Sequence, residues 1–185
     1  MIPGERTDLS DSDAELVARA LNGEAAAFGD LYDRYLNPLY RYVYYRVADR
    51  HEAEDLTETV FLKAWEALKR MDPDRLNFQA WVYRIAHNTV VDHFRRRKPE
   101  VPLEHISNLH HQGPTPEQEA QVKLEEVRLA RAISKLNPDQ QQVIACRFIA
   151  GISHSETAEV MNLREGHVRV LQHRALKRLR ELLDE

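Results

Sequence analysis

The stretch SHSETAEVMNLREGHVRVLQHRALKRLR, residues 153–180, decides the fold of the second half of this chain. Ser153 and Glu156 have the spacing of a capping box, which predicts the start of a short helix. Asn162 follows as a turn residue, and a basic helix is expected from about residue 165 to residue 183. Two helices joined by a tight turn, the second of them basic, form a helix-turn-helix.

A second cluster of positive charge lies nearer the N-terminus, at Arg95-Arg96-Arg97-Lys98. The formal net charge of the 185-residue chain is nevertheless -4. An acidic chain that concentrates its positive charge in two helices is suited to place those helices against a polyanion. Phosphate contacts supply most of the sequence-independent affinity for DNA, so local patches matter more than the overall charge.

The composition narrows the class of protein. Cys146 is the single cysteine, so no internal disulfide can form and a reducing compartment is expected. No window of about 18 apolar residues occurs, and the first residues lack the basic and apolar regions of a signal peptide. The sequence therefore predicts a cytoplasmic protein without a membrane span.

The first half shows helical periodicity throughout. Helices are expected at about residues 13–22, 24–47, 52–71 and 78–97. The tyrosines of the second of these helices are interpreted as core residues, and Pro38 is expected to kink it. Trp81, Ile85 and Val90 mark the buried side of the fourth helix.

Residues 99–121 hold four prolines and neither Lys nor Arg, which is typical of a linker. The predicted fold class is therefore all-α, with two small helical domains joined by a flexible linker. The expected division is a loose N-terminus over 1–12, a first domain over 13–98, the linker over 99–121 and a second domain over 122–185. Asn137-Pro138 predicts a further helix start in the second domain, with Gly151 ending that helix.

Three motifs resemble those of the bacterial sigma-70 family. EDLTETVFLKAW at 54–65 resembles its second conserved region. AWVYRIAHN at 80–88, followed by DHFRRR at 92–97, resembles the segment that reads and opens the −10 element. GHVRVLQHRALKRLR at 166–180 is similar to the helix that reads the −35 element. With two domains and all three motifs in order, the chain resembles the short extracytoplasmic-function (ECF) sigma factors.

The resemblance implies a subunit that binds core RNA polymerase and directs it to promoter DNA. The residues expected to dock on the polymerase clamp are Asp55, Glu58, Thr59 and Leu62. From spacing alone a solvated helix surface is the favoured explanation of this face, and the resemblance is what favours docking. An exposed leucine beside acids also suits a basic partner surface. The family usually has Gln-Glu where this chain has Glu58-Thr59.

In this family a base of the −10 element is unstacked and captured in a protein pocket, which the resemblance places at residues 71–77. Capture costs a few kcal/mol, which stacking and edge contacts offset. The residues expected at the −10 element are Arg75, Asn77, Arg84, His87, Asn88, Arg95 and Arg96. The alternative for the 71–77 segment is a polar loop without a binding role.

At the −35 element the expected contacts are Arg164, Arg169, Val170, His173, Arg174 and Lys177. Arginine can read guanine bidentately, and an apolar side chain can contact a thymine methyl group. Lys177 is assigned to the phosphate backbone. The family often has Ser or Thr at the position of Arg164, so a helix cap worth about 1 kcal/mol is expected to be missing.

Other classes of function have less support in the sequence. The histidines and Cys146 show no metal-ligand spacing, and no nucleophile with an adjacent base or phosphate-binding loop occurs, so neither a cofactor nor enzymatic activity is expected. A stand-alone helix-turn-helix regulator, with 13–98 as a sensing or dimerisation domain, is the main alternative. An adaptor that binds only a partner protein is a weaker one. Short sigma factors are commonly held inactive by an anti-sigma protein, so such a partner is expected.

Overall fold

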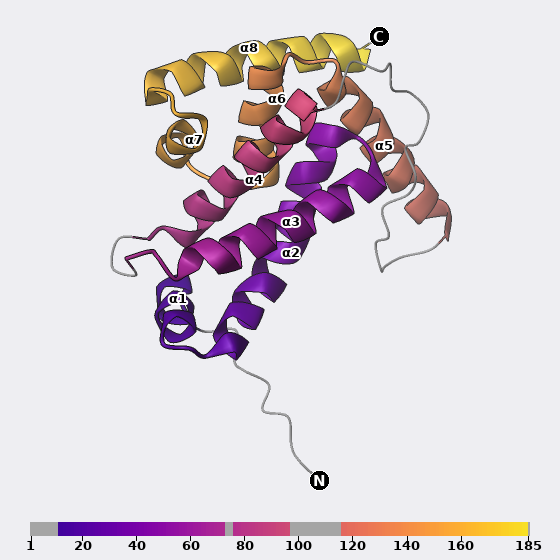
Figure 1. The fold of residues 1–185 in the computed structure, drawn as a ribbon. Helices are drawn as coiled ribbons and strands as arrows, with labels where there is room; N and C mark the ends of the chain where they lie inside the picture. Colours follow the sequence, from indigo (N-terminus) through magenta and orange to yellow (C-terminus); the bar gives the residue numbers. More distant parts are fainter. Residues whose placement is uncertain (1–10, 73–75, 97–115, 185) are drawn as a thin grey trace.

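The computed structural model describes residues 11–72, 76–96 and 116–184, and these residues form helices and no strands. The α-helices are α1 (Asp13–Leu21), α2 (Ala25–Val47), α3 (Arg50–Leu68), α4 (Phe78–Arg96), α5 (Pro116–Ser134), α6 (Pro138–Ile144), α7 (His154–Met161) and α8 (Glu165–Asp184), and a π-helix, η2 (Ala145–Ile149), follows α6. In Figure 1, α1–α4 form one bundle, and α8 lies across its upper end above α6 and α7. The predicted all-α fold class is confirmed.

Helix α2 is the centre of the first bundle. Its inward face carries Leu31, Tyr35, Leu39 and Tyr42 at spacings of three and four residues, and all four side chains are buried. This spacing keeps one face of a helix turned to the core. The expectation that the tyrosines pack a core is therefore confirmed. The helix continues through Pro38 as a single element.

Local signals set the ends of the neighbouring helices. The Ser12–Glu15 capping box opens α1, and the Asp49 side chain accepts from the backbone N–H of Glu52 at 2.9 Å to open α3. Helix α3 therefore begins at Arg50, slightly before the expected position. It ends at Leu68, before Met71. Helix α4 occupies the expected range almost completely.

The second half differs from expectation in two places. Helix α5 begins at Pro116, inside the stretch expected as linker, and the rest of that stretch, residues 99–115, lies outside the described residues. The helix opened by the Asn137 capping box changes to a π-helix after Ile144. Its wider turn is marked by the Ala150 N–H donating to the Ala145 carbonyl at 2.9 Å. Propensity does not predict such a turn, which is rare and depends on packing.

The helix-turn-helix forms as predicted. The Ser153–Glu156 capping box opens α7, and Asn162 ends it in the left-handed conformation with φ 54°. The Leu163 N–H donates to the Ala158 carbonyl at 2.9 Å, which tightens the turn before α8. These local contacts fix the direction of α8 relative to α7.

The two halves pack on one another and share a single core. Helix α7 packs along α4, while η2 and α5 pack against α2. At the centre of this contact, Gln142 of α6 donates to the Tyr42 hydroxyl at 2.5 Å. The sequence separates the halves by a linker but gives no indication that they associate.

Candidate nucleic-acid interface

Helix α8 presents a basic face to solvent because most of its apolar residues lie on the other side. Val168, Leu171, Ala175, Leu179 and Leu182 are buried at spacings of three and four residues. The predicted −35 residues Arg169, Val170, His173, Arg174 and Lys177 are all exposed as a result. The structure thus brings these five residues together on one accessible face, whose shape suits insertion into a major groove.

Two details of this face affect its chemistry. Val170 is 47% exposed, so an apolar contact surface stands among the cations. Arg169 donates to the Glu165 carboxylate at 2.5 Å, which holds its guanidinium along the helix. Arg164 lies just before α8, where its carbonyl accepts from the His167 N–H at 2.9 Å. An arginine side chain has no acceptor, so it cannot cap the first turn.

Helix α4 carries the predicted −10 residues, and the structure divides them. Arg84, Asn88, Arg95 and Arg96 are exposed, whereas His87 is half-buried against Gln142 of α6. His87 therefore does not share the exposed basic face on which it was expected. Burial lowers the pKa of its imidazole.

Asn77 occupies the capping position at the start of α4. Its side-chain oxygen accepts from the Ala80 N–H at 3.0 Å. Its side-chain amide donates to the Glu156 carboxylate of α7 at 2.8 Å. Both ends of the Asn77 side chain are thus engaged in this arrangement. The predicted contact Arg75 lies outside the described residues.

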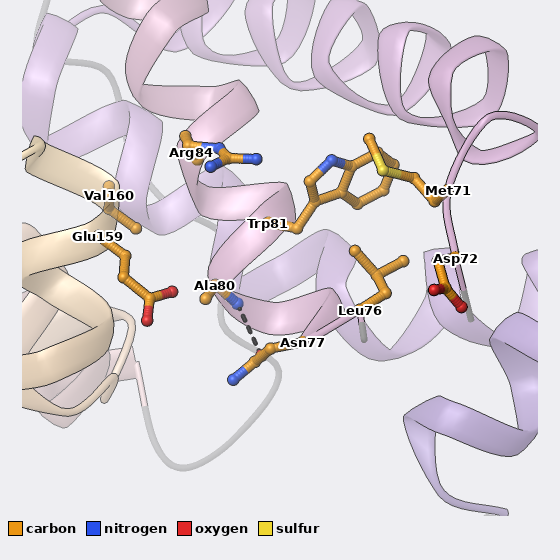
Figure 2. A pocket seen from close by; sticks show the side chains of 9 residues that line it. All are labelled: Met71, Asp72, Leu76, Asn77, Ala80, Trp81, Arg84, Glu159 and Val160. Carbon is orange, nitrogen blue, oxygen red and sulfur yellow. Dashed lines mark hydrogen bonds between the residues drawn. The ribbon is translucent and has the colours of Figure 1, made fainter. Parts of the chain in front are cut away.

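A cleft of about 290 Å³ opens at this end of α4. Its lining residues, drawn in Figure 2, are Met71, Asp72, Leu76, Asn77, Ala80, Trp81, Arg84, Glu159 and Val160. Trp81 and Leu76 supply an apolar wall, Arg84 supplies positive charge, and Glu159 and Val160 come from α7. The mixture of an aromatic wall with polar groups suits a nucleobase. The cleft includes Met71, Asp72, Leu76 and Asn77 of the 71–77 segment that the sequence predicts for base capture, and the remaining residues of that segment lie outside the described residues.

Helix α3 carries a separate exposed face outside the core. Leu62 is 65% exposed, and the carboxylates of Asp55 and Glu58 are exposed on the same helix. Thr59 is half-buried. Its hydroxyl donates to the Asp55 carbonyl at 2.8 Å, so this hydrogen is not available to a partner. An exposed leucine between acids is the arrangement expected for docking on a basic surface with an apolar centre.

Three further observations concern the part of the chain that the structure describes. There, no three His, Cys, Asp or Glu side chains gather as they would to hold a metal ion. Burial raises the pKa of the Cys146 thiol to about 12, which removes its nucleophilic form near neutral pH. None of the described helices is both long and apolar enough to cross a membrane.

Sequence reasoning missed the residues that join the halves. Arg46 of α2 is 5% exposed and donates to the Pro138 carbonyl at 2.9 Å and to the Gln141 side chain at 3.4 Å. Gln142 and Tyr42 are buried beside it. Arg46 and Gln142 are isolated polar residues in helices. Nothing in the sequence around them indicates that they join the two halves. Only the packing of α6 on α2 reveals their role.

Comparisons with known proteins identify the family of the chain. The family model "Sigma-70 region 2" matches residues 31–100, and "Sigma-70, region 4" matches residues 132–181. The ECF RNA polymerase sigma factor BldN of Streptomyces coelicolor is 40% identical over 186 residues, which cover 97% of this chain and 70% of BldN. The RNA polymerase sigma factor CnrH of Cupriavidus metallidurans is 33% identical over 183 residues, covering 94% of this chain and 95% of CnrH.

A solved structure of CnrH in complex with the cytosolic domain of CnrY superposes with a TM-score of 0.75 at 30% identity. It covers 94% of this chain and 98% of CnrH. These matches extend across both halves and do not favour a stand-alone helix-turn-helix regulator. Sigma factors are transcription initiation factors rather than enzymes. The chain belongs to the sigma-70 family, as an ECF sigma factor that binds core RNA polymerase and directs it to promoters.

Proposed function

We propose that the three surfaces divide the work of promoter recognition among them. Residues 13–98 act as region 2, residues 122–185 act as region 4, and residues 99–121 connect them. The observation that carries this assignment is that α3, α4 and α8 each expose most of the residues assigned to one surface, while an apolar stripe of the same helix is buried. On α3 the exposed Leu62 adds apolar contact area beside the carboxylates of Asp55 and Glu58.

Docking on core polymerase falls to Asp55, Glu58, Thr59 and Leu62 of α3. The two carboxylates steer the helix to a basic surface, and Leu62 supplies apolar contact. Because Thr59 already donates to the backbone of its own helix, its contribution is contact through its methyl group and not a new hydrogen bond.

Recognition and opening of the −10 element fall to the cleft and the adjoining face of α4. A flipped base would lie against Trp81, with Asn77 available for its edge. The DNA strand that leads away from the cleft is contacted by Arg75, Arg84, Asn88, Arg95 and Arg96. His87 joins this set only if the two halves separate, because it is turned toward α6.

Recognition of the −35 element falls to α8. Arg169 and Arg174 are assigned to guanine edges, and Val170 to a thymine methyl group. His173 completes the face, while Arg164 and Lys177 contact phosphates. Reading a guanine requires Arg169 to leave the Glu165 carboxylate, so Glu165 competes with the base.

The chain is also proposed to be held by an anti-sigma protein. The related CnrH has been solved with the cytosolic domain of CnrY, and the superposition covers nearly all of both chains. As a partner of core polymerase, the chain is further proposed to act in the cytoplasm.

The assignment is tested by adding the chain to core polymerase. Gel filtration should show a monomer alone and a stoichiometric complex with core enzyme. That holoenzyme should then initiate at discrete sites in a library of genomic fragments. An autonomous dimer that binds a palindrome without polymerase would instead establish the helix-turn-helix regulator.

A further inference from the structure

Helix α8 carries a carboxylate among the cations of its exposed face. Glu165 is the first residue of the helix, and its carboxylate accepts from the Arg169 guanidinium at 2.5 Å. The two residues are four positions apart, so they lie on the same side of the helix. The side chain of Glu165 is 45% exposed and that of Arg169 is 62% exposed. Glu165 therefore lies on the proposed DNA-reading face, at the end of the recognition helix that contacts base edges in helix-turn-helix proteins.

The position of Glu165 places an anion against DNA, which itself carries a high density of negative charge. The ion pair with Arg169 offsets this repulsion in the free chain. When Arg169 moves to a guanine, the Glu165 carboxylate loses its cation and faces the duplex alone. The bound DNA must then supply a hydrogen-bond donor to that carboxylate, or the repulsion weakens the complex.

The major-groove edges of the bases decide which donor is available. Cytosine presents only its N4 amino group, whereas guanine presents two acceptors. Adenine places the acceptor N7 beside its amino group, and thymine presents an acceptor and a methyl group. An ionised carboxylate only accepts hydrogen bonds, so an acceptor on the base repels it. Glu165 thus fits cytosine best among the four bases and disfavours guanine and thymine.

The residue after Glu165 leaves the first turn of α8 open to a duplex. Gly166 is exposed, and a Cβ atom added to it would meet nothing within 4 Å. Glycine is a poor helix former, so neither helix propensity nor packing within the described residues favours it here. A residue without a side chain instead lets another backbone approach closely. DNA can therefore come near α8 beside the Glu165 carboxylate.

We propose that Glu165 is a specificity-determining residue of the −35 helix, which accepts from cytosine N4 at a base pair next to the guanine read by Arg169. The inference rests on the proposed role of α8 at the −35 element. Because one ion pair must open before either base is read, the two base contacts form together. A mismatch at either position leaves Glu165 and Arg169 paired, so a second mismatch adds little further loss.

This coupling is tested by selecting DNA with the holoenzyme from a library that has a randomised −35 region and a fixed −10 element. For the wild type, a mismatch at the guanine or at the cytosine should lower binding roughly tenfold or more, as one wrong base pair usually does. Both mismatches together should lower it about as much as one. Arg169→Ala identifies the guanine position, because this change flattens the preference there.

Glu165→Gln should move the preference at the cytosine position toward adenine, because a glutamine amide can pair with adenine N6 and N7. The losses from the two mismatches should then add, since no ion pair links the two contacts. Glu181→Gln is the matched control, because it makes the same change of charge on α8 and releases Arg178 from its pair at 3.0 Å. The control should strengthen binding to all sequences alike and leave the base preference unchanged.

The outcomes separate this inference from the proposed function. An unchanged base preference in Glu165→Gln, or additive losses in the wild type, would overturn the role of Glu165 while Arg169 keeps its guanine. So would a loss of guanine preference in Glu165→Gln with no change at the neighbouring position, because Glu165 would then only orient Arg169. A wild-type holoenzyme without any −35 preference would overturn the proposed role of α8 and this inference with it.

Discussion

At the scale of single residues, Arg169, Arg174 and Lys177 share one exposed face of α8 but have different proposed roles. Replacing Arg169 or Arg174 by Ala should cost about 1–3 kcal/mol at the preferred −35 element and flatten base preference at one position. Lys177→Ala should weaken all sequences alike and reduce the salt slope by about one unit. Holoenzyme binding to a randomised −35 library measures both. A uniform loss for the arginine variants would point to recognition of DNA shape.

Asn77 combines two roles that a suitable pair of substitutions can separate. Asn77→Ser keeps a side-chain oxygen for the Ala80 N–H but removes the amide donor, so stability should be nearly unchanged while promoter melting falls. Asn77→Ala loses the cap as well and should lower the free energy of unfolding by about 1 kcal/mol. Permanganate footprinting on duplex and pre-melted promoters measures promoter melting. Thermal unfolding of each protein variant measures stability. Normal melting by Asn77→Ser would remove Asn77 from the base pocket.

The residues that sequence predicts well are those whose role follows from one helix alone. Arg169, Val170 and Arg174 lie where helical spacing places them, because the apolar stripe of α8 fixes which face is free. His87 fails the same reasoning. His87 lies three residues after Arg84 on α4, but α6 covers the His87 side chain. The periodicity of α4 alone carries no information about this contact.

At the scale of elements, the exposed face of α3 makes a direct prediction about polymerase binding. The double change Asp55→Arg and Glu58→Arg should weaken binding of core enzyme by roughly tenfold or more, because like charges across an interface are costly. Helicity should not change, since both side chains are exposed and outside the core. Circular dichroism tests the helicity of the variant, and a pull-down with core enzyme tests its affinity. Unchanged affinity would exclude this face as the docking surface.

The sequence predicts a helix boundary well where a side chain caps the helix. It predicts the boundary poorly where packing against another element sets it. The capping boxes at Ser12 and Ser153 mark their helices in both sequence and structure. Helix α5 begins at Pro116, within a stretch whose proline content is typical of a linker. The π-helix after Ile144 packs against α2, and no capping or turn residue within Ala145–Ile149 marks it in the sequence.

At the scale of the whole molecule, the contact between the halves should weaken in mild acid. Burial lowers the pKa of His87 from its usual 6.5, and the nearby Arg46 adds to this effect, although the hydrogen bond with Gln142 and the charge of Asp139 act in the opposite direction. The unfolded chain then binds this proton more tightly, so stability is complete above pH 6.5 and falls as the pH drops toward the lowered pKa. His87→Gln, which stays neutral, should show a smaller loss of melting temperature between about pH 7 and 5.5. Parallel curves for both proteins would contradict this role of His87.

The polar contact around Gln142 and Tyr42 has a consequence for how such a regulator can evolve. These side chains lie away from the proposed DNA and polymerase surfaces. If only chains whose two halves have separated bind promoters, the apparent affinity for every promoter scales with the fraction of separated molecules. A substitution at this contact would then change the output of the whole regulon by one common factor. A substitution on α8 would instead re-rank the promoters. Gene-expression strength and target choice could thus drift independently, through residues on separate parts of one small protein.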